Sequence, residues 1–211
     1  MTFRLIIALG ATLGLSACVT NDTAMRNAPV VQPTFTEAAA SAVQATPLAV
    51  QKITVRVPDI LTVSEANTYK PRADIVWRED PFGDRHEQVR VIVQDAANRA
   101  AAQHISGRAV VIDIQMTKFH AVTEKTRYTI GGTHELNYII TAYDAATGQR
   151  LTEPQLVEQE LKAYGGARAL EAMSRGQTQK VRITDFLTND FDDALSTMVL
   201  PVDPAALIAA R

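Results

Sequence analysis

The chain has 211 residues, of which 46% are hydrophobic and 21% are charged, and its formal net charge is −2 at pH 7. This composition is ordinary for a globular protein that buries a core. Because the chain has no basic excess to attract phosphate groups, we expect no nucleic-acid partner. It contains a single cysteine, Cys18, so no disulfide can form within the chain.

The N-terminus has the pattern of a secretory signal. Arg4 precedes an uncharged, mostly apolar run over residues 5–15, which is about half the length of a membrane-spanning helix. Leu15, Ser16, Ala17 and Cys18 follow, and this string resembles the bacterial lipobox. The resemblance implies that Leu15, Ser16 and Ala17 are recognised for cleavage, that residues 1–17 are removed, and that Cys18 is acylated. The alternative is an ordinary buried thiol after a plain cleavage site.

Residues 18–50 are predicted to form the lipidated cysteine and a flexible tether. Ala, Thr, Pro, Gln and Val dominate this stretch without a sustained helical or strand period. A flexible chain of about 32 residues has a root-mean-square span of roughly 30 Å, enough to hold a domain away from a membrane. Residues 51–200 are predicted to be a single domain, and residues 201–211 a C-terminal tail.

Two strands and a long helix are predicted in the first half of the domain. Apolar and polar residues alternate over residues 52–57 and 73–77, as in half-buried strands. A helix is predicted over 81–105, with Asp80 as its N-cap and Gly107 ending it. The apolar residues at helical spacing are Val89, Ile92, Val93, Ala96, Ala97 and Ala100.

Three strands and a second helix are predicted in the rest of the domain. The first strand places Val110, Ile112, Ile114 and Met116 on one face, and the second covers residues 134–143. The intervening "TEKTRYTIGGT" predicts a hairpin tip or a mobile loop. Residues 155–164 fit a strand or a helix, and the neighbouring turn signals favour a strand. An amphipathic helix is predicted over 179–199.

The order of these elements predicts an α+β fold. We expect a small, mainly antiparallel sheet, with the long helix and the C-terminal amphipathic helix packed on one face. The alanines of the long helix indicate close packing against the sheet.

The sequence contains no intact catalytic or metal-binding motif. The string "HEQVR", which starts at His86, begins like the H-E-x-x-H zinc motif, but arginine occupies the place of the second ligand. His104, His120 and His134 are dispersed, although His120 and His134 could be neighbours on adjacent strands. The two Gly-Gly pairs lack the lysine of a phosphate-binding loop and are taken as turns. We therefore expect no catalytic residue, no metal ion and no cofactor.

Four carboxylates, those of Asp74, Glu79, Asp80 and Asp84, surround Trp77 in "ADIVWREDPFGDR". Paired carboxylates can act as acid and base if burial separates their pKa values, but here Asp80 is expected to cap a helix and the others to face solvent. The lone tryptophan is either an anchor of the core or an anchor that faces a partner. The candidate partner-contact residues are Trp77, Arg78 and Glu79.

The lipobox, the tether and the segment "VWREDPFGDRHEQV" together resemble lipoproteins of an uncharacterised proteobacterial family. This resemblance covers most of the mature chain and implies no activity. The layout is also similar to that of the auxiliary lipoproteins of ABC-type lipid transporters, in which an aromatic segment precedes a long helix and a small sheet follows. That similarity implies an accessory role in an envelope transport complex.

We therefore expect a lipid-anchored protein of the cell envelope that faces the periplasm and acts as a binding or assembly module. Its expected partners are membrane lipid, through acylated Cys18, and an envelope protein. Val19, where an aspartate could follow the cysteine, favours the outer membrane by resemblance to enterobacterial sorting. The alternative is a membrane-tethered periplasmic hydrolase that uses the region of His120 and His134.

Overall fold

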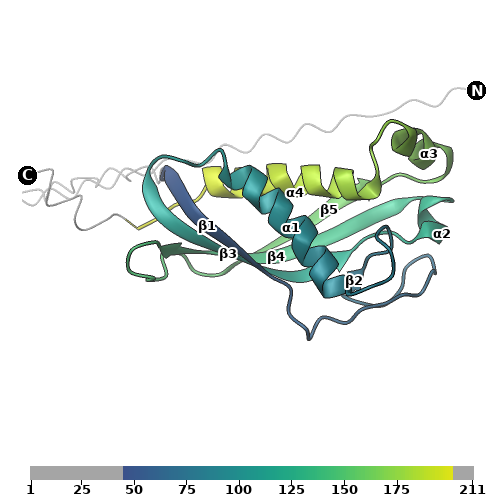
Figure 1. The fold of residues 1–211 in the computed structure, drawn as a ribbon, viewed down its shortest axis with the longest axis horizontal. Coiled ribbons are helices and arrows are strands. Elements are labelled where there is room, and N and C mark those ends of the chain that lie inside the picture. Colours follow the sequence, from purple (N-terminus) through teal and green to yellow (C-terminus); the bar gives the residue numbers. More distant parts are fainter. Residues whose placement is uncertain (1–44, 202–211) are drawn as a thin grey trace, which may run out of the picture. The chain divides into compact units, whose positions relative to one another are not determined.

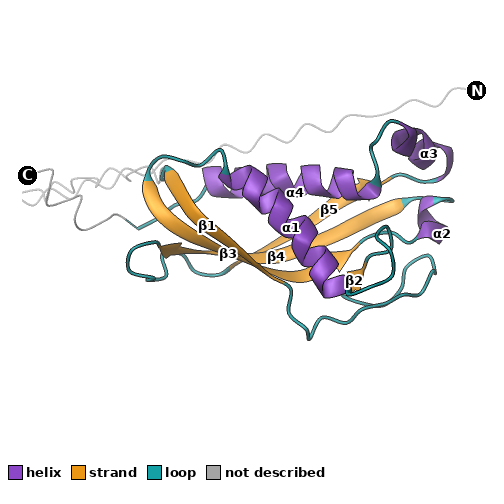
Figure 2. Cartoon of the chain, in the orientation of Figure 1, coloured by secondary structure: helices purple, strands orange, loops and turns teal. Residues whose placement is uncertain are grey.

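The computed structural model describes residues 45–201. Five strands form one sheet, and two long helices, α1 and α4, cross one of its faces (Figures 1 and 2). The strands are β1 (Leu48–Arg56), β2 (Ile75–Val76), β3 (Arg108–His120), β4 (Gly132–Asp144) and β5 (Gln155–Ala163). The helices are α1 (Arg85–Ala101), α2 (Glu124–Arg127), α3 (Gly166–Ser174) and α4 (Gln179–Ser196).

The strands lie in the order β1–β3–β4–β5, and β2 pairs with the C-terminal end of β3. The pairs β3–β4 and β4–β5 are antiparallel, whereas β1 and β2 run parallel to β3. Parallel neighbours need a crossover connection, which α1 provides between β1 and β3. The predicted α+β fold, with both long helices on one face of the sheet, is confirmed.

Helix α1 begins at Arg85 and not at Pro81, and its N-cap is Asp84 and not Asp80. The side chain of Asp84 accepts a hydrogen bond from the backbone N–H of Glu87 at 3.1 Å, which satisfies one of the unpaired donors of the first turn. The helix ends at Ala101, earlier than the predicted residue 105. Its buried face is the predicted one, because Val89, Ile92, Val93, Ala96, Ala97 and Ala100 are all buried.

Strand β1 begins at Leu48, before the predicted start at residue 52. The pairing of β1 with β3 shifts between Val50 and Lys52, so Gln51 is the extra residue of a bulge. The bulge breaks the alternation along the sequence, which is why the first part of the strand was not predicted. The predicted tether boundary at residue 50 therefore falls inside this strand. Strand β2 is shorter than predicted, with two residues in place of the segment 73–77.

The segment 155–164, which fitted both a strand and a helix, contains strand β5. Two helices were not predicted: α2 lies within the predicted hairpin tip or mobile loop, and α3 begins at the second glycine of the second Gly-Gly pair. Helix α4 ends at Ser196, before the predicted residue 199. It begins after Thr178, whose hydroxyl oxygen accepts a hydrogen bond from the backbone N–H of Val181 at 3.3 Å.

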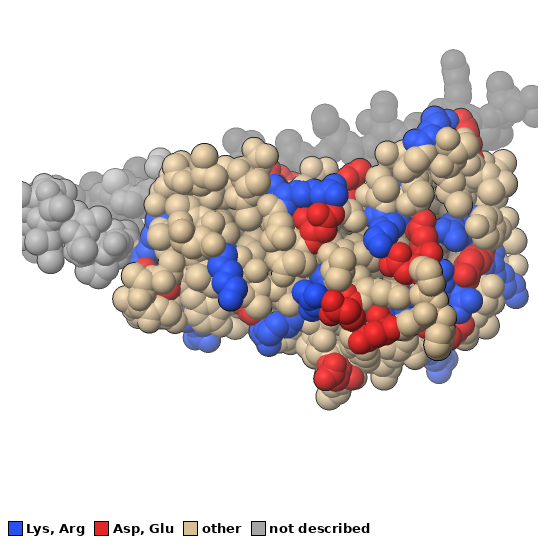
Figure 3. Space-filling view, viewed as in Figure 1, with Lys and Arg blue, Asp and Glu red and all other residues tan. Residues whose placement is uncertain are grey.

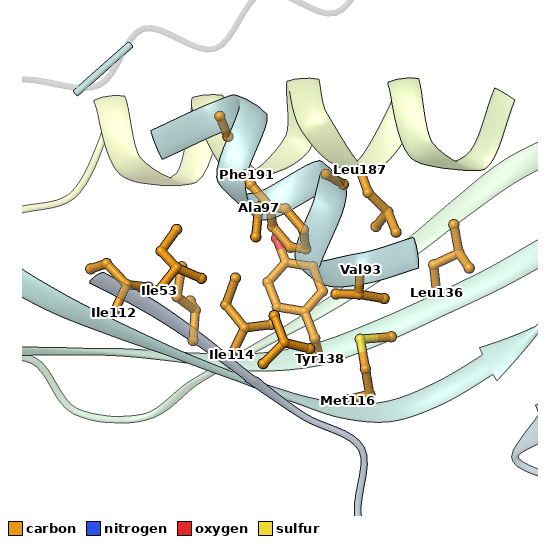
Figure 4. Packing of buried hydrophobic residues seen from close by; sticks show 14 of the residues in the cluster. Ile53, Val93, Ala97, Ile112, Ile114, Met116, Leu136, Tyr138, Leu187 and Phe191 are labelled. Carbon is orange, nitrogen blue, oxygen red and sulfur yellow. The ribbon is translucent and has the colours of Figure 1, made fainter. Parts of the chain in front are cut away.

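The core lies between the two helices and the sheet. Figure 4 shows side chains of α1 and α4 pointing toward those of β3 and β4. The rings of Tyr138 and Phe191 meet edge to face, with centroids 4.9 Å apart. The Tyr138 hydroxyl donates a hydrogen bond to Oδ2 of Asp190 at 2.6 Å, so this buried polar group is satisfied.

Candidate functional site

The predicted lipidation residue Cys18 and the recognition residues Leu15, Ser16 and Ala17 lie outside the described residues. Lipid attachment therefore stays a prediction from the sequence. Within residues 45–201, no helix is both long and apolar enough to cross a membrane.

The prediction that Trp77 contacts a partner is wrong, because its side chain is completely buried. The indole ring packs edge-on against Phe119, with centroids 5.7 Å apart. Its N–H donates a hydrogen bond to Oδ2 of Asp80 at 2.8 Å. Trp77 is therefore an anchor of the core, which is the other reading that the sequence allowed.

Arg78 and Glu79 connect segments that are distant in the sequence. Nε of Arg78 donates to Oε2 of Glu124 in α2 at 2.6 Å, and Nη1 lies 3.2 Å from Oε2 of Glu65. Oε2 of Glu79 accepts from the backbone N–H of Lys180, in the first turn of α4, at 2.7 Å. Both side chains are mostly covered, so their first role is to hold these segments together.

The other carboxylates near Trp77 also have structural partners. Asp74 accepts hydrogen bonds from the hydroxyl and the backbone N–H of Thr62, and these bonds lower the pKa of its carboxyl. Asp80 binds the Trp77 indole and the Lys180 ammonium. A carboxylate held in its ionised form cannot donate a proton near neutral pH.

Acidic and basic side chains are interleaved on the face of the molecule that Figure 3 shows.

The histidines do not form a catalytic pair. His120 is the register partner of Glu135. Since successive residues of a strand point to opposite faces, His120 and His134 lie on opposite faces of the sheet. Nε2 of His86 lies 3.0 Å from the carbonyl oxygen of Leu61, so this ring nitrogen already has a hydrogen-bond partner. Among residues 45–201, no three His, Cys, Asp or Glu side chains gather closely enough to hold a metal ion.

The strongest candidate site is a small pocket where β4 begins and β5 ends, between α2, α3 and the first turn of α4. We call it the arginine pocket. Its polar lining includes Arg127, His134, Gln179 and Arg182, and its apolar wall includes Ala163, Ala169, Ala172 and Met173. The cavity volume is about 20 Å³, which is room for about one water-sized group.

Two glycines allow the walls of this pocket to meet. Gly131 has φ of +70°, a conformation that glycine adopts without strain. A Cβ atom on Gly165 would lie 2.1 Å from the backbone nitrogen of Gly131. The two Gly-Gly pairs, taken from the sequence as separate turns, are therefore in backbone contact, and a side chain at Gly165 would separate the walls.

Arg127, the last residue of α2, is 8% exposed. Within the described part of the chain, its Nε and Nη1 atoms are buried and have no hydrogen-bond partner. The nearest carboxylate oxygen in an ion pair with it is Oε1 of Glu79, 3.6 Å from Nη1. Its Nη2 reaches only the Tyr128 hydroxyl, at 3.5 Å. The guanidinium thus has two buried donors without a hydrogen bond, an arrangement that is costly without a ligand or water.

Arg182 extends from the first turn of α4 into the same pocket. Its guanidinium carbon lies 3.7 Å from the centroid of the Tyr164 ring, a cation–π contact, and its Nη2 donates to the carbonyl oxygen of Lys162 at 2.7 Å. Arg168 lies 4.1 Å from the same centroid. Burial is the main reason why the pKa of Arg182 is lowered from its ordinary value. The contacts with Tyr164 and Lys162 hold this second guanidinium group at the pocket.

His134 is 1% exposed, and burial together with the charges of Arg182 and Arg127 lowers its pKa to about 3. The ring is therefore neutral at ordinary pH. Its Nδ1 accepts a hydrogen bond from the backbone N–H of Val122 at 3.3 Å, which leaves the ring proton on Nε2.

His134 should make folding pH-dependent. Its pKa is about 3 in the folded protein and 6.5 in the unfolded chain, so between these values the unfolded chain binds more protons. Stability from the neutral ring is fully present above pH 6.5 and is lost as the pH falls toward 3. By pH 4.5 the loss should be about 2–3 kcal/mol.

Urea unfolding from pH 7 to 4.5 measures this loss, and His134→Asn is the reference, because asparagine does not titrate and can still accept from Val122. The variant should lose less stability than the wild type over this range. Equal losses in the two proteins would show that His134 is not a buried neutral ring.

The arginine pocket could not be predicted from the sequence. Arg127 lies in the predicted hairpin tip or mobile loop, and Arg182 lies near the start of the predicted amphipathic helix, outside the apolar positions that define its buried face. The only signals in the sequence were the two Gly-Gly pairs and the histidine that follows the first of them. Nothing in the sequence indicated that the pairs touch.

The fold and the site define a class of protein: an α+β domain with helices on one face of the sheet and a cationic pocket at one end. Residues 48–207 match the model of a family of unknown function, DUF6778, and the chain belongs to that family. The expected membership of an uncharacterised family is confirmed to this extent. The comparison with curated proteins gave no match.

Solved structures with a related arrangement are distant, at 12% identity. A DUF330 protein from Xanthomonas campestris aligns over 73% of this chain and 84% of its own, with a TM-score of 0.41. A candidate lipoprotein from Caulobacter crescentus aligns over 51% and 80%, with a TM-score of 0.31. A minor lipoprotein from Acinetobacter baumannii aligns over 69% and 91%, with a TM-score of 0.30. Likeness at this level carries no conclusion about function.

Proposed function

We propose that this protein is a bacterial lipoprotein, anchored in the cell envelope through acylated Cys18, and that its tethered domain acts by binding. The anchor is inferred from the lipobox that ends at Cys18. The binding role rests on one observation, the arginine pocket, in which two fixed guanidinium groups and a neutral imidazole surround a small cavity. Groups that are held in place before a ligand arrives reduce the entropy cost of binding it.

The chemistry of the pocket favours binding over the hydrolase alternative. A general base works best when its pKa is near the operating pH, and a pKa of about 3 makes His134 a weak base. Within the described residues, no serine, cysteine, aspartate or glutamate lines the pocket to act as a nucleophile. His120, the other histidine of that alternative, lies on the opposite face of the sheet.

Two finer parts of the proposal rest on the sequence. The outer membrane is favoured because Val19 follows the acylated cysteine. An accessory role in an envelope transport complex is supported only by the similarity of layout to the auxiliary lipoproteins of lipid transporters.

Cys18→Ser should abolish acylation and move the protein out of the membrane fraction. A serine hydroxyl cannot form the thioether that carries the lipid, and stable anchoring needs two or more acyl chains. Mass spectrometry of the membrane-extracted wild type should find a mature N-terminus at Cys18 with acyl chains attached. An unmodified Cys18 thiol in the wild type, or unchanged membrane attachment of the variant, would contradict the proposal.

Crosslinking in intact cells, followed by mass spectrometry, tests the binding role. The wild type should give a reproducible envelope partner, and the unanchored Cys18→Ser protein should give less of it. Turnover of a substrate by the purified protein, lost in His134→Asn, would overturn the binding role in favour of the hydrolase.

A further inference from the structure

We propose that the arginine pocket captures the carboxylate of an N-acylated amino acid, as found at the C-terminus of a peptide. This inference rests on the proposed binding role and names the ligand class of the same site. Three properties of the pocket lead to it: an unbalanced positive charge, a set of unpaired hydrogen-bonding atoms, and a small volume.

The positive charge of the pocket favours an anionic ligand. Arg127 and Arg182 line it, whereas no carboxylate does within the part of the chain that the structure describes. Glu79 approaches Arg127 from outside this lining, at 3.6 Å, and its other oxygen is already bound to the backbone of Lys180. A buried cation without a fully bonded partner is destabilising, so binding of an anion would stabilise the folded protein.

The unpaired atoms distinguish a carboxylate with a neighbouring N–H from a bare anion. Nε and Nη1 of Arg127 are buried donors that lack a hydrogen-bond partner among the described residues, and each of them could donate a single charged hydrogen bond to a carboxylate oxygen. Oε1 of Gln179 is a buried acceptor in the same condition. An N-acylated amino acid supplies both complements, since its carboxylate accepts and its amide N–H donates.

The volume limits the size of the ligand. About 20 Å³ is room for one water-sized group, so one oxygen of a carboxylate could enter while the rest of the ligand lies at the mouth of the pocket, and a tetrahedral phosphate is larger than a planar carboxylate. Ala163, Ala169 and Ala172 form the apolar wall of this space. The remainder of a peptide would extend outward past Tyr164 and the exposed Gln177.

Titration of the full chain with N-acetylglycine, acetate and inorganic phosphate tests this inference. Every sample carries Cys18→Ser, so the result does not depend on lipid attachment and separates failure of the pocket from failure of the anchor. Calorimetry gives the affinity, and the ring signals of His134 in NMR spectra locate the site. We expect saturable binding of N-acetylglycine, weaker binding of acetate, and no saturable effect of phosphate.

Arg127→Gln and Arg182→Gln should each weaken N-acetylglycine binding about tenfold or more, because each removes charged hydrogen-bond donors. Arg175→Gln is the matched control: it makes the same charge change directly after α3, but at a side chain that is 62% exposed and paired with Glu171. It should alter affinity less than about twofold, within the range of surface substitutions. Thermal melting checks that each variant folds. If Arg127→Gln does not fold, the effect of Arg182→Gln on N-acetylglycine binding alone tests the inference.

Three outcomes would overturn the inference. The first is the absence of saturable binding by N-acetylglycine at millimolar concentrations. The second is phosphate binding that is as tight as N-acetylglycine binding. The third is an equal loss of affinity in Arg175→Gln, which would show a general response to surface charge.

Discussion

Ala96→Asp should lower the free energy of unfolding by several kcal/mol. Ala96 is 0% exposed and lies on the face of α1 that packs on the core, with Val93 and Ala100 one turn away on either side. An aspartate there places a charge in an apolar environment with no partner, and the larger side chain also forces the tightly packed helix away from its neighbours. Substitutions of this kind belong to the short list of mechanisms with large effects. Urea unfolding followed by circular dichroism measures the loss.

Asn98→Asp is the control for Ala96→Asp, since it introduces the same side chain two residues away on the exposed face of the same helix. Asn98 accepts a hydrogen bond from Gln94 through Oδ1, at 2.9 Å, and an aspartate can accept it too. The control should change stability by less than about 0.5 kcal/mol. Similar losses in both variants would mean that the burial of α1 is assigned to the wrong face.

Trp77→Ala should destabilise the fold by about 3–5 kcal/mol, the usual cost of removing a large aromatic side chain from a core. The ring is completely buried, packs edge-on against Phe119, and binds Asp80 through its N–H. The truncation leaves a cavity and removes one of the donors that satisfy Asp80, which then keeps only Lys180. Chemical unfolding of the purified variant measures the cost. This result would separate a core anchor from the partner-facing anchor that the sequence also allowed.

Two further variants define the cause of this loss. Phe82→Ala removes an aromatic ring that is 85% exposed, from the same loop, and should be nearly neutral apart from a contact with Arg85 at 5.9 Å. Trp77→Phe keeps an apolar ring but drops the N–H, so it should cost less than Trp77→Ala. A Trp77→Ala protein as stable as the wild type would contradict the burial described above.

The lipid anchor and the arginine pocket account for different parts of the proposed function. The lipobox and the tether concern where the domain is held, and the pocket concerns what it holds there. These are separate claims, because the first depends on chemistry at Cys18 and the second on Arg127 and Arg182. Each can fail without the other, which is why the anchor is tested by acylation and the pocket in an unanchored protein.

Several features of the protein could be predicted from its sequence because they depend on local pattern. The buried face of α1 follows from apolar residues at helical spacing, and the inward face of β3 follows from the alternation of Val110, Ile112, Ile114 and Met116, all of them buried. The α+β class followed from the order of the elements. The predicted lipid anchor at Cys18 is likewise a local signal, and it still awaits its test.

Tertiary structure alone decided the rest. The predicted N-cap, Asp80, does not cap α1 because it binds the nearby Trp77 indole and Lys180 of the distant helix α4. The pocket is the clearest case: Arg127, His134 and Arg182 belong to three different elements, and the contact between Gly131 and Gly165 helps to bring those elements together. Periodicity reports which side of one element is buried, whereas a site depends on which elements pack against each other, and that depends on contacts between residues far apart in the chain.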